Sequence, residues 1–337
     1  MEEFRIPKEV QFVLNRLNTA GHEAFCVGGC VRDTLLGLSP ADWDVTTNAL
    51  PDTVKACFPD CRLVETGIKH GTVTILVNEL PIEATTYRAD GVYRDHRHPE
   101  QVAFSSRLED DLARRDFTVN AMAYQPKQGL VDVFGGKTDL RAALLRCVGD
   151  PARRFEEDAL RILRCLRFSA TLGFSIEAGT DTVLREKREL LSFISRERIC
   201  EELLRLLEGR DAEQTLRQYS EVIFPLLPKL LPMSKRRIRH LLGTLGETRF
   251  FALLDLMEPQ DGAVKEARSC AREIIAREKA LRRQELAITG RDLLAMGIPP
   301  GPELGAILKL LDELVRDGKI ENERAGLLEA AEQACKK

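Results

Sequence analysis

Over the first 150 residues, short apolar runs with a period of two alternate with amphipathic segments at the helical period. Glycine and asparagine separate these segments, as at Gly21 and at the turn Asn78–Leu80 of a β-hairpin pattern. This alternation predicts a domain of α+β class with a short mixed sheet. We expect helices over residues 8–20, 31–37 and 108–124, strands over residues 23–29 and 41–48, and a β-hairpin over residues 72–88.

The pattern changes at Pro151, because the residues beyond it follow the helical period almost throughout. Residues 154–173 and 195–207 are clear amphipathic helices, and further leucine-rich segments follow them. We therefore expect an α+β chain in which an N-terminal head precedes an all-helical neck, body and tail. The expected boundaries are head 1–150, neck 151–208, body 209–285 and tail 286–337.

The composition of the 337 residues is typical of a globular protein, since 44% are hydrophobic, 31% are charged and the formal net charge is −3. The disordered, collagen-like and membrane-spanning classes are excluded, because no run approaches the ~20 apolar residues of a membrane span. The first ten residues have neither the basic start nor the apolar core of a signal peptide. We therefore expect a cytoplasmic protein with no membrane partner.

Charge is unevenly distributed along the chain. Residues 1–150 carry 17 Lys and Arg against 22 Asp and Glu, whereas residues 151–337 carry 33 against 31. Basic side chains of the second part gather within residues 153–167, 185–198 and 235–239. Such stretches can be solvated helix faces, and they can also form a basic surface for a polyanion. The near-neutral total therefore does not exclude nucleic acid as a partner.

Nine cysteines are scattered through the chain, and the pairs Cys26/Cys30 and Cys57/Cys61 have CxxxC spacing. No second cysteine or histidine pair follows them at the distance typical of a zinc site. An odd number of cysteines without an export signal does not predict a disulfide framework. We interpret these four cysteines as reduced thiols of the core.

Two carboxylates, Asp42 and Asp44, stand two residues apart in a segment that predicts a strand. Side chains alternate along a strand, so both carboxylates project from one face and can bind one metal centre. Carboxylate oxygens without nearby Cys or His ligands favour Mg²⁺. Upstream, Gly28 and Gly29 would let backbone N–H groups approach a triphosphate at a helix start, and Arg32 would add a charge-assisted hydrogen bond. Alone, two acids at the end of a strand are common without any such role.

Taken together, these segments resemble a known family. The string VGGCVRDTLLG followed by ADWDVTTN resembles the signature of the template-independent nucleotidyltransferases of the DNA polymerase β superfamily. More narrowly, it is similar to class II tRNA nucleotidyltransferases and bacterial poly(A) polymerases. The resemblance implies a nucleotidyltransferase head over residues 1–150 in which Asp42 and Asp44 hold the catalytic metals.

A second segment, LARRDFTVNAMAY, is similar to the RRDFTxNA motif of the same family. The resemblance implies that the phosphates and ribose of the nucleotide are contacted by Arg114 or Arg115, Asp116 and Asn120. The alternative is a purely local pairing of Asp116 with Asn120, four residues further along a helix.

Glu83 lies in the second half of the predicted hairpin, on a strand that could run beside the strand of Asp44. That placement makes Glu83 a candidate third catalytic carboxylate. Sheet pairing does not follow from one sequence, and a local bond to Thr85 or Arg88 is the alternative.

The segment Glu157–Arg161 has the pattern EDxxR. At helical spacing Asp158 and Arg161 would be neighbours, and an acceptor beside fixed donors could present the hydrogen-bonding edge of a template base. Alone, this pattern is that of a common surface ion pair. The family resemblance implies that Asp158 and Arg161 read the base and that Arg164 and Arg167 contact the nucleotide beside them.

Two further segments resemble parts of the same family. SRERICEELLRLL is similar to the segment that stabilises the base-reading helix, and its Arg198 and Glu202 are expected to form an ion pair. Residues 88–106 are expected to form a long polar loop that CC-adding members lack, which favours an enzyme able to add A. The helical region before the tail looks shorter than in many members.

The resemblance implies an enzyme that adds C and A from CTP and ATP to the 3′ end of tRNA, with Mg²⁺ as cofactor and pyrophosphate as product. The tail is expected to bind tRNA, and addition of A alone is an alternative. A bacterial poly(A) polymerase is disfavoured, because the sequence ends in AAEQACKK without the basic extension usual in those enzymes. A catalytically silent RNA-binding protein of the same fold would have lost metal or base-reading residues, and none is lost.

Overall fold

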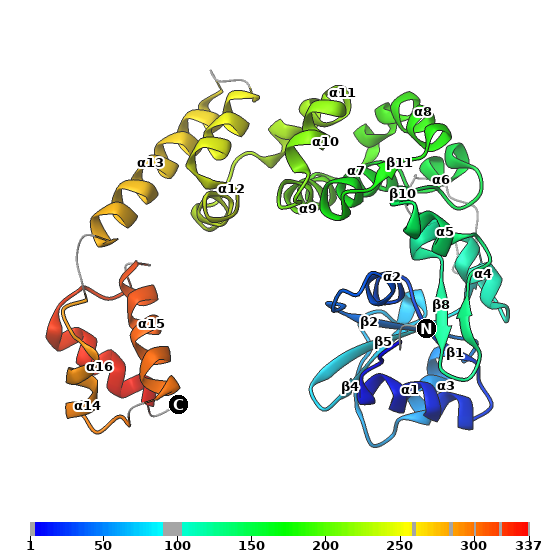
Figure 1. Ribbon diagram of the computed structural model, residues 1–337, viewed down its shortest axis with the longest axis horizontal. Helices are drawn as coiled ribbons and strands as arrows, with labels where there is room; N and C mark the ends of the chain where they lie inside the picture. Colours follow the sequence, from blue (N-terminus) through cyan, green and yellow to red (C-terminus); the bar gives the residue numbers. More distant parts are fainter. Residues whose placement is uncertain are drawn as a thin grey trace. The chain divides into compact units, whose positions relative to one another are not determined.

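The computed structural model describes residues 4–89, 103–257, 261–282, 286–299, 301–316 and 319–335. The chain forms two compact units, Met1–Leu230 and Leu231–Lys337. The first unit contains a sheet and a set of helices that follow it in sequence, and the described part of the second unit is helical (Figure 1). The division falls inside the expected body, and the four expected domains stay a prediction.

A seven-stranded mixed sheet forms the centre of the first unit. Its strands lie in the order β3-β4-β5-β2-β1-β8-β9, in which β2 and β5 are parallel and the other neighbours are antiparallel. The strands are β1 (Ala24–Val27), β2 (Trp43–Thr47), β3 (Arg62–Val64), β4 (Thr72–Val77), β5 (Leu80–Thr86), β8 (Ala123–Gln125) and β9 (Gly129–Val131). The expected α+β class, with a short mixed sheet in the head, is confirmed.

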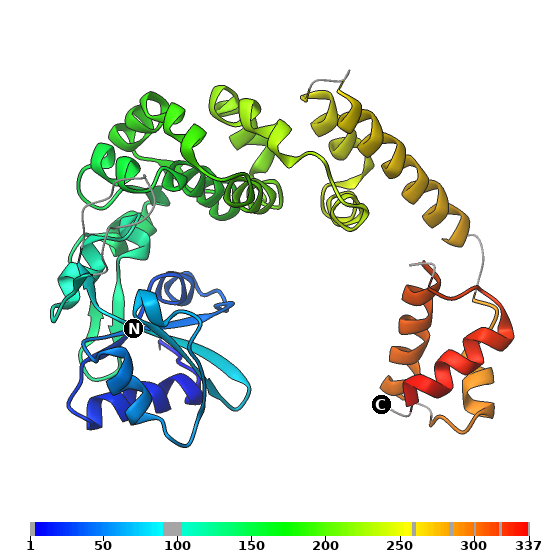
Figure 2. The same cartoon turned by 180° about the vertical axis from the view of Figure 1, so that it is seen from behind.

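Helices cover both faces of this sheet (Figures 1 and 2). They are α1 (Lys8–Thr19) and α3 (Pro51–Cys57) on one face and α2 (Gly29–Leu35) on the other. α1 buries Val10, Val13 and Leu17, the apolar stripe that its spacing predicts. β1 is buried along its whole length, so the middle of the sheet is the hydrophobic core of this part.

β4 and β5 form the expected hairpin. Its turn is made by Asn78 and Glu79, whose φ angles of 47° and 65° are the left-handed values that a two-residue hairpin turn requires. The hairpin prediction is therefore confirmed, and it brings β5 to the side of β2.

A small antiparallel ribbon follows the hairpin. It consists of β6 (Arg88–Ala89) and β7 (Ala103–Phe104), with Arg88 opposite Phe104. The loop expected over residues 88–106 thus begins and ends in this ribbon, and its residues 90–102 lie outside the described residues.

The prediction of one helix over residues 108–124 is wrong beyond Ala113. α4 (Leu108–Ala113) ends early, a 3₁₀ turn η2 (Thr118–Asn120) follows, and the chain then enters β8. Phe117 forms an antiparallel bridge with Cys147, and its side chain is completely buried. This tertiary pairing outweighs the local helical pattern.

Helices make up the rest of the first unit, together with a short parallel pair, β10 (Leu144–Leu145) and β11 (Ser175–Ile176). The helices are α5 (Gly136–Arg141), α6 (Pro151–Glu157), α7 (Leu160–Leu172), α8 (Ala178–Glu186), α9 (Arg196–Leu207), α10 (Ala212–Gln218) and α11 (Ser220–Ile223), with 3₁₀ turns η3 (Arg188–Phe193) and η4 (Phe224–Leu230). α7 and α9 pack side by side (Figure 1). Their buried leucines, among them Leu163 and Leu203, form the core of this helical part.

The single helix expected over residues 154–173 is two helices. Asp158 lies between α6 and α7 with φ −142° and ψ 101°, which is extended backbone. Its carboxylate accepts a hydrogen bond from the backbone N of Leu160, at the start of α7, and pairs with Arg198 on α9. These bonds hold Asp158 outside both helices.

The second unit contains α12 (Lys235–Asp255), which is kinked at Gly246, α13 (Gly262–Arg282), α14 (Gly290–Ala295), α15 (Pro302–Arg316) and α16 (Arg324–Cys335). A small core joins the last three of these helices. Its buried residues are Ile288, Leu293, Ile298, Ile307, Leu311, Val315, Leu327 and Ala331. The helical pattern expected for this part is found.

Within the described ranges, no helix combines the length and the hydrophobicity needed to cross a membrane. The eight cysteines whose side chains the structure describes are free thiols. Cys26 and Cys30 lie in the core as expected, whereas Cys57 and Cys61 are only partly buried.

Candidate active site

β2 and β5 bring three carboxylates together. The parallel register of these strands places Asp44 directly opposite Glu83. Asp42 comes just before β2, close enough for its charge to act on Asp44. Asp42 and Glu83 are exposed, and Asp44 is partly buried. The strand pairing that made Glu83 a candidate is therefore present.

Burial and neighbouring negative charges perturb the ionisation of Asp44. Burial, followed by the negative charges of Asp42 and Glu83, raises the pKa of Asp44 to about 6, against a lowering by Arg115. A carboxylate that is costly to ionise gains most from a bound cation. Among the described residues, no three His, Cys, Asp or Glu side chains are placed to hold a metal ion alone. Two aspartates still suit Mg²⁺, which binds one or two carboxylates and completes its shell with water and phosphate oxygens.

The glycine turn at Gly28, before α2, lies against the guanidinium of Arg115. Gly28 has a φ of +81°, and a Cβ atom at this position would lie 2.9 Å from Nη1 of Arg115. Gly29 begins α2, whose first backbone N–H groups have no acceptor within the helix. Position 28 therefore requires glycine for its conformation and for the close approach of Arg115.

Asp111, which the sequence analysis did not single out, holds both arginines of the RRD segment. Its carboxylate is completely buried and accepts from Nη2 of Arg114 (2.5 Å) and Nη2 of Arg115 (3.1 Å). It also accepts from Oγ1 of Thr46 on β2 (3.1 Å) and from the backbone N of Arg88 on β6 (3.3 Å). Burial raises the pKa of Asp111, but the charges of Arg115 and Arg114 outweigh burial and bring the pKa to about 2. An acid three and four residues before two arginines was the signal for this pairing.

Asp116 and Asn120 form the local pair that was the alternative to nucleotide contact, because Nδ2 of Asn120 donates to Oδ1 of Asp116 (3.1 Å). Oδ2 of Asp116 accepts from Nε and Nη2 of Arg164 on α7 (2.9 and 2.7 Å). Burial raises the pKa of Asp116, but Arg164 and Asn120 outweigh burial and hold the pKa well below its usual range. Arg32 joins this network, donating to Oδ1 of Asn120 (2.7 Å) and Oδ1 of Asp33 (2.8 Å). The contact of Asp116 with ribose stays a prediction.

Asp158 and Arg161 take separate partners, contrary to the pair expected from helical spacing. Asp158 accepts from the backbone N of Leu160 (3.1 Å) and from Nη2 of Arg198 (2.9 Å). Arg161 donates to Oε2 of Glu157 (2.9 Å) and to two backbone oxygens. The extended backbone at Asp158 removes it from the helical row, which leaves Glu157 as the partner of Arg161. Reading of the base by Asp158 and Arg161 stays a prediction.

Arg198 and Glu202 on α9 also take partners other than each other, although they are four residues apart. Arg198 binds Asp158, whereas Oε2 of Glu202 accepts from Nε of Arg167 (2.6 Å). Oε1 of Glu202 lies 3.8 Å from Nη1 of Arg164. Since α7 and α9 pack side by side, charges that face one another across the two helices pair in preference to charges along one helix.

The structure gathers the expected site residues into two groups within the first unit. Asp42, Asp44 and Glu83 form the acidic group on the sheet. The basic group contains Arg32, Arg114, Arg115, Arg161, Arg164 and Arg167, and Gly28, Gly29, Asp116, Asn120 and Asp158 lie beside it. The sequence analysis missed Asp111, the buried acid that holds Arg114 and Arg115, and it assigned other partners to Asp158, Arg161, Arg198 and Glu202.

Three family models match the chain. "Poly A polymerase head domain" matches residues 24–146, "Probable RNA and SrmB- binding site of polymerase A" matches residues 173–239, and "tRNA nucleotidyltransferase domain 2 putative" matches residues 245–331. The CCA-adding enzyme of Levilactobacillus brevis is 36% identical over 98% of both chains, and that of Limosilactobacillus fermentum is 35% identical over 96% of both. The chain belongs to the CCA-adding enzymes.

Solved structures of CCA-adding enzymes share the fold. That of Bacillus stearothermophilus, in complex with CTP, is 29% identical, with a TM-score of 0.62 over 98% of both chains. That of Thermotoga maritima, complexed with tRNA, is 22% identical, with a TM-score of 0.62 over 98% of this chain and 97% of that one. The resemblance drawn from the sequence motifs is thus confirmed, and the chain is a tRNA nucleotidyltransferase.

The alignment with the L. brevis CCA-adding enzyme extends over 392 positions, more than the 337 residues of this chain. The relative therefore contains stretches without a counterpart here. The expectation that the helical region before the tail is short for the family stays a prediction.

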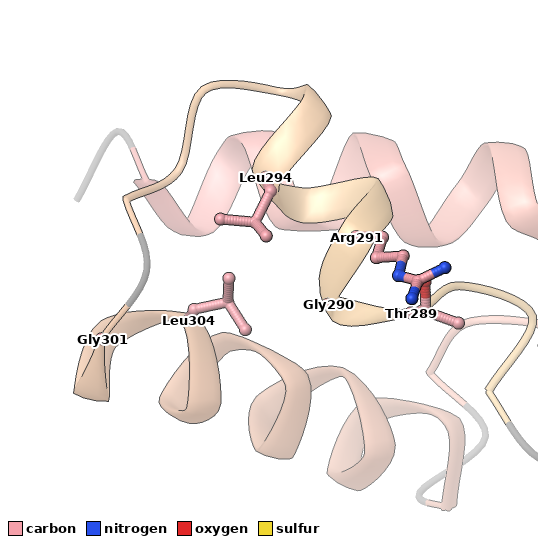
Figure 3. Close-up of a pocket in the computed structure, with 6 residues that line it drawn as sticks. All are labelled: Thr289, Gly290, Arg291, Leu294, Gly301 and Leu304. Atoms are coloured by element: carbon pink, nitrogen blue, oxygen red, sulfur yellow. The ribbon is translucent and has the colours of Figure 1, made fainter.

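The second unit of this CCA-adding enzyme has a hollow of about 560 Å³ between α14 and α15. Leu294 and Leu304 face one another across it, and Thr289, Gly290 and Arg291 lie at its other end (Figure 3). Arg291 is exposed, so the hollow combines an apolar floor with one accessible guanidinium.

Asp44→Asn is expected to stabilise the folded protein at neutral pH in the absence of divalent cations. The pKa of Asp44 is about 6 in the folded state and about 3.9 in the unfolded state, so folding favours the protonated acid. At a pH above about 6, ionisation of Asp44 therefore lowers the free energy of unfolding. The variant should therefore melt higher than the unaltered protein at pH 7.5 in EDTA, by about 2–4 °C for each kcal/mol relieved. The difference should shrink at pH 5.

Thermal unfolding at both pH values measures this effect. Asp52→Asn is the control, since the Asp52 side chain is 90% exposed and should change the melting temperature little. Addition of Mg²⁺ should stabilise the unaltered protein more than Asp44→Asn. Equal melting temperatures of the Asp44 variant and the unaltered protein in EDTA at pH 7.5 would contradict the crowding of charge at this site.

Proposed function

We propose that the chain adds C, C and A in turn to the 3′ end of tRNA, from CTP and ATP, with release of pyrophosphate. The observation that carries the proposal is the register that sets Asp44 opposite Glu83, with Asp42 beside them. Full-length similarity to CCA-adding enzymes supports the same activity. The enzyme would act in the cytoplasm, where tRNA and both nucleotides are present.

Asp42 and Asp44 would hold Mg²⁺, with Glu83 adding a third negative charge beside them. When bound, the ion supplies activation of the attacking hydroxyl and neutralisation of the leaving pyrophosphate. The 3′ oxygen of tRNA bonds to the α-phosphorus of the nucleotide, and the bond from that phosphorus to the bridging oxygen breaks. Pyrophosphate leaves with the electron pair, and the hydroxyl proton passes to solvent. The raised pKa of Asp44 supports a site that requires a cation.

The turn Gly28–Gly29 and the start of α2 would hold the triphosphate, with Arg115 as the adjacent cation. Arg115 is favoured over Arg114, because it lies against Gly28 and its charge acts on Asp44. Arg114 donates to Asp111 through both Nε and Nη2, whereas Arg115 donates to it through Nη2. Arg32 would contribute from the far side of the same turn, where it is already fixed by hydrogen bonds.

Asp158 and Arg161 would recognise the base, flanked by Arg164 and Arg167. Each of the two has a protein partner, and a carboxylate or a guanidinium has capacity for further hydrogen bonds. Glu157 keeps the guanidinium of Arg161 in one orientation, which suits recognition of a fixed hydrogen-bonding edge.

The tail, residues 286–337, would bind tRNA away from its reacting end. The match to "tRNA nucleotidyltransferase domain 2 putative" over residues 245–331 supports this assignment. The exposed Arg291 beside the hollow of Figure 3 is a suitable contact for backbone phosphate. Recognition there would rest on shape and charge rather than on base sequence.

Three tRNA transcripts test the activity: one that ends before CCA, one that ends after the first C, and one that ends after CC. Supplied with CTP, ATP and Mg²⁺, the protein should complete CCA on all three. Extension of only the third would assign A addition, and long A tails would assign poly(A) synthesis.

Asp44→Ala should reduce extension by at least about 10³-fold while tRNA binding persists, in line with the loss of a catalytic metal ligand.

Asp158→Asn is expected to weaken the choice of nucleotide. The amide keeps one oxygen that can accept from the backbone N of Leu160, but it lacks the negative charge and has an NH₂ donor in place of the second acceptor oxygen. Incorporation of UTP or GTP relative to CTP and ATP should therefore rise by roughly tenfold or more. Asp150→Asn is the matched control, because Asp150 caps α6 through Ala152 without any proposed contact to the base. Competition assays with mixed nucleotides measure the ratio, and an unchanged ratio contradicts base reading by Asp158.

Arg291→Glu is expected to raise KM for tRNA several-fold, because it places a negative charge where a phosphate would bind. KM for CTP should stay within about twofold. Lys309→Glu, the same reversal of charge at an exposed position of α15 outside the hollow, is the control. Equal effects of the two variants on KM for tRNA would show that the hollow is not a specific contact.

A further inference from the structure

Phe168 lies at the centre of the arginines that the proposed function assigns to the nucleotide. It belongs to α7 and is 6% exposed. The guanidinium carbon of Arg167 lies 3.9 Å from the ring centroid, that of Arg32 lies 5.1 Å away, and that of Arg164 lies 5.5 Å away. The ring of Phe117 meets Phe168 edge-on at 5.9 Å and 86°.

Three cations around one ring repel one another, so the cluster needs compensation. Each guanidinium has an acid: Arg32 pairs with Asp33, Arg164 with Asp116 and Arg167 with Glu202. An acid binds one edge of a guanidinium and leaves its planar face available for a further contact. An aromatic ring attracts cations toward its electron-rich face, which adds a second point of contact for each guanidinium.

The ring also joins two parts of the first unit. Arg32 comes from α2, next to the glycine turn, whereas Arg164 and Arg167 come from α7. The hydrogen bonds from Arg32 through Asn120 and Asp116 to Arg164 run between the same elements. Phe168 thus connects Arg32 with Arg164 through its ring, as these hydrogen bonds do through polar groups.

We propose that Phe168 is a positioning residue for nucleotide binding, because its aromatic ring sets where the guanidinium groups of Arg32, Arg164 and Arg167 meet the incoming CTP or ATP. This rests on the proposed function, which assigns those arginines to the nucleotide. An aliphatic side chain of similar volume would fill the same space but would not attract the three cations. The distinction between shape and ring electrons makes the role testable.

Replacement of Phe168 by 3,4,5-trifluorophenylalanine keeps the shape of the ring and weakens its attraction for cations. The readout is the Kd of CTP with Mg²⁺ and without tRNA, measured by titration calorimetry, together with KM and kcat for CTP in tRNA extension. We expect the Kd and KM of CTP to rise about threefold for the fluorinated ring and about tenfold for Phe168→Leu, with kcat changed by less than about threefold. The melting temperature of the fluorinated protein should match that of the unaltered one.

Phe174→Leu is the matched control. Phe174 is 7% exposed, follows directly after α7, and has no guanidinium or ring contact among the described residues. We expect Phe174→Leu, like Phe168→Leu, to have a lower melting temperature than the unaltered protein. Its Kd for CTP should equal that of the unaltered protein. The proposal is overturned if Phe168→Leu and Phe174→Leu raise the Kd of CTP equally. It is also overturned if the fluorinated protein has an unchanged Kd for CTP. If Phe168→Leu does not fold, the fluorinated protein alone decides.

Failure of the proposed function is separable from failure of this role. An unaltered protein that binds CTP but extends no tRNA contradicts the proposed activity, and the ratio of Kd values still tests Phe168. An unaltered protein that binds no CTP contradicts both. A protein that extends tRNA, with a Kd for CTP independent of the ring at position 168, contradicts the role of Phe168 alone.

Discussion

Pairing between buried carboxylates and arginines is the interaction on which the basic group of this site depends. The acids concerned are each at most 7% exposed and each accept from at least one arginine: Asp111, Asp116, Glu157 and Glu202. An ionised carboxylate buried without a partner costs several kcal/mol, so these acids leave the arginines little choice of position. Strands, turns and helices that carry the arginines are thereby fixed to one another.

The carboxylates on the sheet follow the opposite rule. Burial, followed by the negative charges of Asp42 and Glu83, raises the pKa of Asp44. Arg115 acts against this rise, but its guanidinium is held by Asp111. The two groups thus differ, because the basic group pairs its charges with buried acids, whereas the acidic group keeps an excess of negative charge that the proposed Mg²⁺ would neutralise.

Features encoded locally could be predicted from the sequence, and features that depend on distant partners could not. The apolar pattern predicted the strand that carries Asp44, with Asp42 just before it in the structure, and the hairpin pattern brought Glu83 toward them. The break at Asp158 escaped prediction, because apolar residues such as Phe155, Ala159 and Ile162 keep the helical spacing across it, whereas Arg198, which binds its carboxylate, lies forty residues later. For the same reason Glu202 was matched to its neighbour Arg198 instead of Arg167 on another helix. Asp111 was within reach of local reasoning, since its spacing to both arginines is helical.

Burial of the acid–arginine pairs has a consequence for ionic strength. Salt screens exposed charges over about 8 Å at physiological concentration, but it acts far less on pairs that counterions cannot reach. The proposed attraction of tRNA phosphates to exposed groups such as Arg291 would therefore weaken as salt rises. The pairs around Asp111 and Asp116 would persist under the same conditions, so binding of tRNA and the arrangement of the proposed nucleotide site would respond to salt independently.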